Sequence, residues 1–240
     1  MILKDLVNDI LANNIDNKNE DEFEIYSNYL EMSAYENSLY ARCNIRNIAG
    51  IDEVGRGPLA GPVVSCAIIL PKGYFLPGLT DSKKISEKKR DYYYERLIKD
   101  AISYGIGIVD VSEIDKFNIY SCTKKAMIKA VNNLTKKPDH LLIDAMSLEL
   151  NIPQTSIIKG DQKSKSIAAA SIIAKVTRDR YMEKLAEKCP EYHFDKNKGY
   201  GTKEHFAALN EYGPSIYHRK SFSPIKEMIE SNHNLFNIDF

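Results

Sequence analysis

The sequence predicts an α/β fold in which a mixed β-sheet is flanked by helices and preceded by a short N-terminal extension. Two observations lead to this prediction. From residue 46 onward, short apolar or β-branched runs alternate with longer stretches of helical periodicity, which is the order of elements in a single α/β domain. Three of the short runs also lead into acidic residues, and in such folds functional side chains gather at strand ends.

The predicted strands, in chain order, are 47–53, 63–70, 104–109, 141–143 and 156–160. The second of these is a continuous β-branched and apolar run, which is typical of a buried strand. The last two are short buried strands in this prediction, and each ends directly at an aspartate, Asp144 or Asp161.

The predicted helices are 86–101, 112–134 and 164–188. Ser86 is a suitable N-cap for the first. The second has an apolar stripe that includes Ala126, Met127 and Ala130. The third contains the small run Ala168-Ala169-Ala170, which lets a helix lie close against a sheet.

The chain divides into an acidic extension at 1–44, a catalytic-type domain at 45–226 and a tail at 227–240. Within the extension, Leu3, Leu6 and Ile10 recur at helical spacing, whereas 13–24 is polar and is predicted as a loop or linker. The acidic character of the extension disfavours direct contact with DNA, so we expect its removal to leave the position at which the domain acts unchanged. The loss of like charge would strengthen DNA binding modestly. The alternative is that the extension packs on the domain and stabilises it.

Charge is distributed unevenly along the chain. Residues 1–40 hold nine acidic and two basic residues, a net of −7, which leaves 31 basic and 24 acidic residues, a net of +7, for the remainder. A basic body is the expected electrostatic footprint of a nucleic-acid binder, although an ordinary lysine-rich surface would give the same count.

The composition favours an ordinary globular protein, with 43% hydrophobic and 28% charged residues and no apolar run long enough to cross a bilayer. The N-terminus lacks the features of a secretory signal. The four cysteines are widely scattered, so reduced thiols are expected rather than a disulfide framework or zinc site. Together these features predict a cytoplasmic protein.

The most informative motif is the stretch 50–62, in which Asp52 and Glu53 end an apolar run and a glycine-rich turn with one arginine follows. Carboxylates at a strand end suit Mg²⁺ or Mn²⁺, which prefer oxygen ligands. Glycines allow close approach of a backbone to a ligand, and Arg56 can hold a phosphate through two hydrogen bonds. Metal beside phosphate indicates phosphoryl-transfer chemistry.

Four carboxylates are therefore candidate catalytic residues and metal ligands: Asp52, Glu53, Asp144 and Asp161. Together at one sheet edge they would repel one another unless cations were bound. Two divalent ions about 4 Å apart would neutralise them and bracket a scissile phosphate. Any one of these residues alone could instead be a cap or turn residue.

Further candidates lie in three loops. Ser164 opens a predicted helix, where it could meet a phosphate or act as the N-cap, as could Ser166. Lys83 and Lys84 have phosphate-contact chemistry but could equally be surface lysines. Tyr200 lies between two glycines, which leaves its ring accessible for stacking on a base or sugar, unless it packs the turn. Three histidines near this region, His193, His205 and His218, are too widely spaced for a metal motif, so surface or capping roles are expected.

These motifs together resemble the ribonuclease HII family, the type 2 ribonucleases H, over about residues 47–226. The resemblance rests on an ordered set of segments: 50–62, 81–84, 142–144, 159–161, 166–179, 198–202 and 218–222. Arg56 and the following proline distinguish the chain from the sister ribonuclease HIII family, which lacks this arrangement and has a larger N-terminal domain.

The resemblance implies a ribonuclease H-like fold and metal-dependent cleavage of RNA in RNA–DNA hybrids. It also implies incision 5′ of ribonucleotides embedded in duplex DNA, by two-metal-ion hydrolysis that leaves 3′-hydroxyl and 5′-phosphate ends. The family's catalytic carboxylates fall on the four named above. Its element that senses the ribose 2′-hydroxyl falls on Gly55, Arg56 and Gly57, and its junction-sensing tyrosine on Tyr200.

Three rival functions fit the sequence less well. Another nuclease or strand-transfer enzyme of the same broad fold would share the carboxylates but has no evident use for the glycine-arginine-glycine element. A non-catalytic nucleic-acid-binding module would not need four acids at strand ends. A nucleotide-binding protein would end its glycine loop in Gly-Lys-Ser/Thr, which is missing after Gly61.

The expected partners are an RNA–DNA hybrid and ribonucleotide-containing duplex DNA, with no membrane, and the protein is expected to be a monomer. The apolar tail at 234–240 is a candidate contact for a replication sliding clamp, although packing on the protein's own last helix is the commoner role of such a segment.

Overall fold

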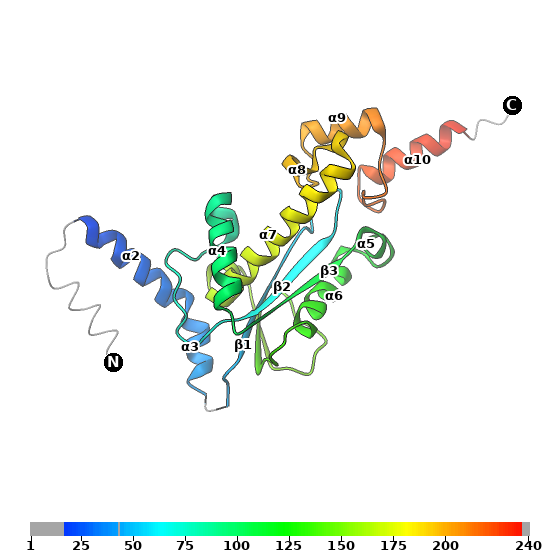
Figure 1. Ribbon diagram of the computed structural model, residues 1–240. Coiled ribbons are helices and arrows are strands. Elements are labelled where there is room, and N and C mark those ends of the chain that lie inside the picture. The colour runs from blue at the N-terminus through cyan, green and yellow to red at the C-terminus, as the bar shows by residue number, and fades with distance from the viewer. Residues whose placement is uncertain (1–16, 43, 237–240) are drawn as a thin grey trace.

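The computed structural model describes residues 17–42 and 44–236 of the chain. Its centre is a five-stranded mixed sheet in the order β3-β2-β1-β4-β5 (Figure 1). The strands are β1 (Ile48–Val54), β2 (Val63–Ile69), β3 (Ser103–Val109), β4 (His140–Asp144) and β5 (Gln154–Ile157). β1 pairs antiparallel with β2 and parallel with β4, so it lies at the junction of the antiparallel and parallel halves of the sheet.

Helices cover both faces of the sheet. The α-helices are α2 (Asn17–Met32), α3 (Ala34–Tyr40), α4 (Glu87–Asp100), α5 (Val111–Phe117), α6 (Ile119–Asn132), α7 (Lys165–Lys188), α8 (Phe194–Asn197), α9 (Lys203–Tyr212) and α10 (Ile225–Phe236). Short 3₁₀ turns are η1 (Ser82–Lys84), η2 (Gly160–Gln162) and η3 (Pro190–Tyr192). None of the helices in the described residues is long and apolar enough to span a membrane.

The two faces of the sheet bury different side chains. On one face, Cys66 and Ile68 of β2 pack with α7 and with Leu97 of α4. On the other, Ile51 and Ala67 pack with α6. This alternation along β1 and β2 is the period of two expected of strands that are buried on both sides, and it confirms the predicted layered α/β fold.

α7 lies directly against the centre of the sheet because β1 carries a glycine at the point of contact. A Cβ atom at Gly50 would fall 2.1 Å from the backbone carbon of Ser166, a distance that no real Cβ contact shows. Ala168, Ala169, Ala170 and Ala174 of α7 are fully buried. The predicted close contact of a small-residue helix with the sheet is therefore confirmed, and it brings the start of α7 against β1 two residues before Asp52.

The structure corrects three sequence predictions. Residues 17–24, predicted as loop, belong to α2, whose acidic N-terminal turns favour a helix through the helix dipole. The predicted helix 112–134 is divided into α5 and α6 at Asn118, which adopts φ +66° and caps α6. The predicted buried strand 156–160 is instead β5, a mostly half-exposed strand at the edge of the sheet.

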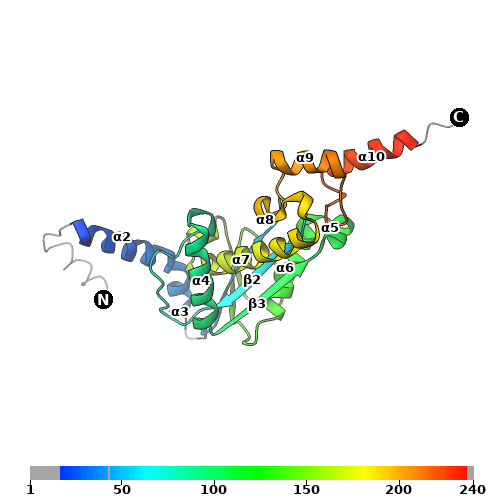
Figure 2. The same cartoon turned by 45° about the horizontal axis from the view of Figure 1, so that its top comes forward.

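The extension packs on the domain at 45–226 within the described residues. Met32 of α2 and Leu39 of α3 are buried and belong to two of the core clusters. α2 and α10 lie at opposite ends of the molecule (Figure 2). This packing favours the alternative in which the extension stabilises the domain over the expectation that the extension can be removed without effect. The proposed amphipathic helix around Leu3 and Ile10 lies outside the described residues.

Candidate active site

The first three candidate carboxylates meet because of the register between β1 and β4. Ile51 pairs with Ile143 in the parallel ladder, so the next residues, Asp52 and Asp144, emerge side by side at the carboxyl ends of their strands. Together with Glu53 they offer ligand oxygens that all lie within 4.8 Å of one another. Strand pairing therefore assembles this group from positions about ninety residues apart in the chain.

The surroundings of this group make its negative charge costly. Burial, followed by the neighbouring charges of Glu53 and Asp144, raises the pKa of Asp52 well above its usual range. Burial also raises the pKa of Glu53, although the guanidinium of Arg56, 3.4 Å away, opposes this. No ion pair is formed by Asp52 or Asp144 within the described part of the chain. Glu53 thus has Arg56 as a positively charged partner, whereas Asp52 and Asp144 have none among the described residues.

Asp161 lies close to this group but outside it. Rather than ending a strand as predicted, it is in the 3₁₀ turn η2, after β5 has ended at Ile157. The backbone N–H of Gly160 donates to Asp144 Oδ1 over 2.7 Å, which connects the two carboxylate-bearing segments. Burial, and then the nearby carboxyl of Asp81, raises the pKa of Asp161.

The residues present fit a divalent metal. Oxygen Oε2 of Glu53 is buried and has no hydrogen-bond partner, as expected for a ligand atom whose partner is a cation. Carboxylate-only ligand sets suit Mg²⁺ and Mn²⁺. Asp52, Glu53 and Asp144 would hold one such ion, and Asp161 is near enough to influence the pKa of Asp52.

The glycine-arginine-glycine turn begins where β1 ends and continues from the carboxylates. Gly55 has φ +92°, and a Cβ there would fall 2.3 Å from the side chain of Arg178, so both conformation and space require glycine. Gly57 is exposed, and a Cβ there would lie 3.9 Å from Cε1 of Tyr200. The structure thus brings Tyr200 next to the turn, and this residue is 44% exposed.

Two buried arginines hold this turn in place, and neither stands out in the sequence. Arg219 donates from its guanidinium to the carbonyls of Gly55, Arg56 and Gly61 over 2.6–3.1 Å. Arg178 donates to three further carbonyls, of which Lys198 precedes the Tyr200 turn. Both arginines are fully buried, and burial lowers the pKa of Arg178 to about 10 and that of Arg219 to about 9.

Two buried histidines form a chain of hydrogen bonds to the turn that carries Tyr200. The N–H of Ser215 donates to His218 Nδ1, so neutral His218 carries its proton on Nε2 and donates it to His205 Nε2 over 2.9 Å. His205 then donates from Nδ1 to the carbonyl of Tyr200 over 2.9 Å. Both histidines are fully buried, which corrects the expectation of surface roles for them.

The lysine and serine candidates lie in different environments. Lys83 is exposed, and its charge opposes the raised pKa values of Glu53 and Asp161, so it lies on the carboxylate side. The side chain of Lys84 is outside the described part of the structure. Ser164 is fully buried and caps α7 by accepting from the N–H of Ile167. Its predicted phosphate contact therefore has no accessible hydroxyl, whereas its predicted capping role is observed.

Asp81, Arg178 and Arg219 are not identified as candidates in the sequence analysis, because their sequence signals are weak. Asp81 stands out only as the start of a lysine loop, although its side chain is buried beside Asp161 and accepts from the N–H of Lys83. Apart from the carbonyl of Lys198, the carbonyls bound by the two arginines belong to residues more than a hundred positions away, and such partners leave no pattern in a single sequence.

Comparison with known proteins shows the family to which the chain is similar. Residues 49–224 match the family model described as Ribonuclease HII. A curated relative named Ribonuclease HII, from Bacillus cytotoxicus, is 59% identical over 203 residues, which cover 85% of this chain and 78% of the relative.

Two solved structures resemble the fold. The ribonuclease H2 of Pyrococcus horikoshii matches with a TM-score of 0.68 and 26% identity, covering 78% of this chain and 99% of that one. A chain in the structure of the PCNA:RNase HII complex from Archaeoglobus fulgidus matches with a TM-score of 0.62 and 24% identity, covering 74% and 95%. These findings confirm the resemblance and the ribonuclease H-like fold. The chain therefore belongs to the ribonuclease HII family, and it is a ribonuclease H, an endonuclease acting on RNA–DNA hybrids.

Proposed function

We propose that the protein also incises duplex DNA on the 5′ side of an embedded ribonucleotide, by two-metal-ion hydrolysis that leaves 3′-hydroxyl and 5′-phosphate ends. Mg²⁺ or Mn²⁺ would be the cofactor. The carboxylates alone do not distinguish a ribonucleotide from a deoxyribonucleotide, so this specificity requires residues that contact the 2′-hydroxyl.

The observation that carries the proposal is a continuous row of residues from the carboxylates to the tyrosine. Arg56 contacts Glu53 over 3.4 Å, Gly57 follows Arg56 directly, and the Tyr200 ring lies against Gly57. A sugar that lay on Gly57 and Tyr200 would therefore place its neighbouring phosphate near Glu53. This arrangement supports a substrate in which the sugar that is recognised and the phosphate that is cleaved are neighbours.

Each part of the row has a chemical task. The exposed backbone at Gly57 can approach a 2′-hydroxyl because no side chain intervenes. Arg56, which is exposed, can leave Glu53 and donate two hydrogen bonds to a phosphate. The half-exposed Tyr200 ring offers a stacking surface for the adjacent sugar.

The metals would be held by Asp52, Glu53, Asp144 and Asp161. When bound, they supply activation of the attacking water and stabilisation of the leaving oxygen. The chain's own contribution is to fix the carboxylates through strand register and through the hydrogen bond from Gly160 to Asp144. Lys83 adds positive charge beside Glu53 and Asp161, where a phosphate would arrive.

The test is cleavage of a labelled DNA duplex that contains one ribonucleotide, with Mg²⁺ or Mn²⁺, beside an all-DNA duplex and an RNA–DNA hybrid. We expect one cut, 5′ of the ribonucleotide, and extension of the upstream product by a polymerase, which requires a 3′-hydroxyl. Cleavage of the hybrid with an intact single-ribonucleotide duplex, or a cut on the 3′ side, would overturn the proposal.

A clamp contact through the C-terminal tail remains a prediction. The similar chain from Archaeoglobus fulgidus was solved in a PCNA complex, which supports it. Residues 237–240 lie outside the described structure. A pull-down with the sliding clamp, comparing the full chain with one that ends at Asn232, would show equal recovery if the prediction were wrong.

A further inference from the structure

Glu36, in the N-terminal extension, makes an unusual contact with the catalytic domain. Its side chain is 1% exposed, and its Oε1 accepts from Ser164 Oγ over 2.7 Å and from the N–H of Ser166 over 3.0 Å. Ser166 is near the first turn of α7, so the carboxylate satisfies a free N–H at the positive end of that helix. A capping group for α7 is thus supplied from 128–130 residues earlier in the chain.

This contact continues by hydrogen bonds to the metal-site carboxylates. The N–H of Ser164 donates to the carbonyl of Gly160 over 2.8 Å. The N–H of Gly160 in turn donates to Asp144 Oδ1 over 2.7 Å. Asp161 follows Gly160 directly in the same 3₁₀ turn. Glu36 therefore holds the turn at 160–164. The backbone of this turn orients the side chain of Asp144, and the turn itself carries Asp161.

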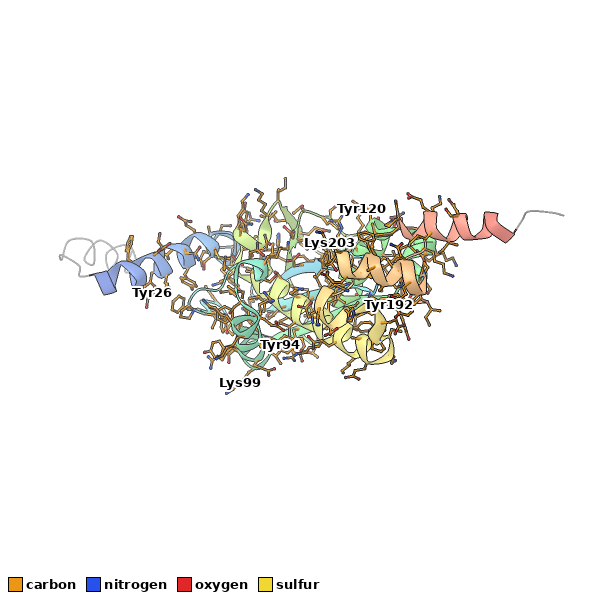
Figure 3. The ribbon with its side chains drawn as sticks, turned by 90° about the horizontal axis from the view of Figure 1, so that it is seen from above. Tyr26, Tyr94, Lys99, Tyr120, Tyr192 and Lys203 are labelled. Carbon is orange, nitrogen blue, oxygen red and sulfur yellow. The ribbon has the colours of Figure 1, made fainter. Side chains whose placement is uncertain are left out.

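Further contacts fix the position of the extension against the rest of the protein. Lys165, which is buried, lies over the ring of Tyr29 at 4.9 Å and donates to the carbonyl of Tyr74. The Tyr29 hydroxyl donates to the carbonyl of Gly73, and the Tyr26 ring stacks on Phe75 with centroids 5.2 Å apart. Tyr26 marks this contact at the N-terminal end of the molecule, on α2 (Figure 3).

We propose that Glu36 is a positioning residue for the metal-binding carboxylates, so that the extension is part of the apparatus that binds the catalytic cation. This inference rests on the proposed metal site. Groups that hydrogen-bond metal ligands fix ligand orientation, and their loss typically weakens metal binding or activity about 10–100-fold. Glu36 acts one step further away, through the backbone of the 160–164 turn.

The test is direct Mn²⁺ binding by calorimetry, without nucleic acid, on the full chain and its variants. Glu36→Ala should weaken Mn²⁺ binding about 10-fold, and Glu36→Gln, which keeps an acceptor but loses the charge, should weaken it less. Affinity for an RNA–DNA hybrid measured in a metal chelator should remain within about twofold, because phosphate contacts dominate it. Cleavage should then recover at high Mn²⁺ concentration.

Two controls separate positioning from stability. Glu31→Ala removes an exposed carboxylate from the same extension and should leave Mn²⁺ binding unchanged. Leu209→Ala removes a buried side chain from the cluster around α9, away from the carboxylates, and serves as the destabilised reference. If both Glu36 variants bind Mn²⁺ as tightly as Leu209→Ala, the role is merely structural and the proposal is wrong. Should Glu36→Ala not fold, Glu36→Gln decides in the same way.

Asp144→Asn distinguishes failure of this inference from failure of the metal site. If Asp144→Asn binds Mn²⁺ like the wild type, the proposed metal site itself is wrong. If Asp144→Asn loses Mn²⁺ binding while the Glu36 variants keep it, the metal site stands and only the role of Glu36 is refuted.

Discussion

Arg178 Nη1 donates to the carbonyl of Lys198 over 2.8 Å, while the same guanidinium holds the carbonyls of Ala60 and Pro62. One side chain of α7 thus joins the turn after β1 to the turn that carries Tyr200. The planar guanidinium matters here because a lysine ammonium cannot reach three separated carbonyls at once.

Arg178→Lys should therefore destabilise the protein by about 2–4 kcal/mol, since it leaves buried carbonyls without donors. Incision at a single ribonucleotide should fall further than the folded fraction does, because the two turns lose their fixed relation. Denaturant unfolding and activity per folded molecule measure both effects. Arg180→Lys, an exposed position on the same helix, is the matched control and should change stability by less than about 0.5 kcal/mol.

Asp144→Asn should reduce the rate of metal-supported cleavage by about three orders of magnitude or more, because it removes one ligand charge at the centre of the site. The asparagine oxygen can still accept from Gly160, so the fold should persist. Without metal, the variant should melt at the same or a higher temperature than the wild type, since one of the clustered carboxylates is gone.

Metal addition provides the complementary measurement. Mn²⁺ at about 100 times its dissociation constant should stabilise the wild type by about 2.7 kcal/mol, and Asp144→Asn by much less. Equal upward shifts of the melting temperature in the two proteins would indicate that the ion binds elsewhere.

Tyr200→Ala should reduce incision at a single embedded ribonucleotide about 10-fold or more, by analogy with the stacking energy of about 1–3 kcal/mol per aromatic contact. The Tyr200 hydroxyl makes no hydrogen bond within the described residues, and the turn backbone is held by His205, so stability should change little. Tyr200→Phe keeps the ring and should retain most activity. A large fall in melting temperature with normal activity per folded molecule would instead show that the ring only packs the turn.

Stability should decline in mild acid because of the histidine pair. Burial, and then the neighbouring His205, lowers the pKa of His218 to about 4, whereas an unfolded histidine titrates near 6.5. The native protein keeps His218 neutral while the unfolded chain takes up a proton. The stabilisation is therefore complete above about pH 6.5 and is lost as pH falls toward 4, by about 3 kcal/mol in total.

His218→Gln isolates this contribution from that of other titrating groups. Denaturant unfolding of both proteins between about pH 4 and pH 8 should give a difference in stability that shrinks by about 3 kcal/mol toward the acid end. A difference that stays constant across the range would show that His218 is not kept neutral by the fold.

Deletion of residues 1–40 should lower the melting temperature markedly, contrary to what the acidic composition of the extension suggests. The deletion removes two buried apolar side chains, Met32 and Leu39, each of which contributes about 2 kcal/mol by burial. Thermal melting of the truncated chain checks this, with Glu31→Ala as a control for loss of charge alone. An unchanged melting temperature would restore the view that the extension is dispensable.

The sequence is sufficient for those parts of the site that depend on local pattern. Asp52 and Asp144 are predictable because each follows an apolar strand, and parallel pairing then brings them together. Asp161 lies near this group, but its position in a 3₁₀ turn could not be predicted, because the apolar run before it continues past the end of β5.

Residues whose partners are distant backbone atoms cannot be predicted in this way. The roles of Arg178 and Arg219 depend on carbonyls presented by separate loops, and that of Glu36 on a helix start far along the chain. The helix at 17–32 escapes prediction because its few apolar side chains are spread among acidic ones, and contacts such as that between Tyr29 and Phe75 help to hold it in place.

α7 connects the two parts of the proposed active site as a single rigid element. Ser166, near its start, touches β1 beside the carboxylates, and Arg178, three turns later, holds the turns that carry the tyrosine and the glycines. The helix contains neither glycine nor proline between these points, so it spans about 18 Å without a hinge. The number of residues in this segment therefore sets the position of the glycine and tyrosine turns relative to the carboxylates. Inserting one residue would rotate the far end of the helix by about 100°, so we expect a sugar bound at these turns no longer to bring its phosphate to the carboxylates.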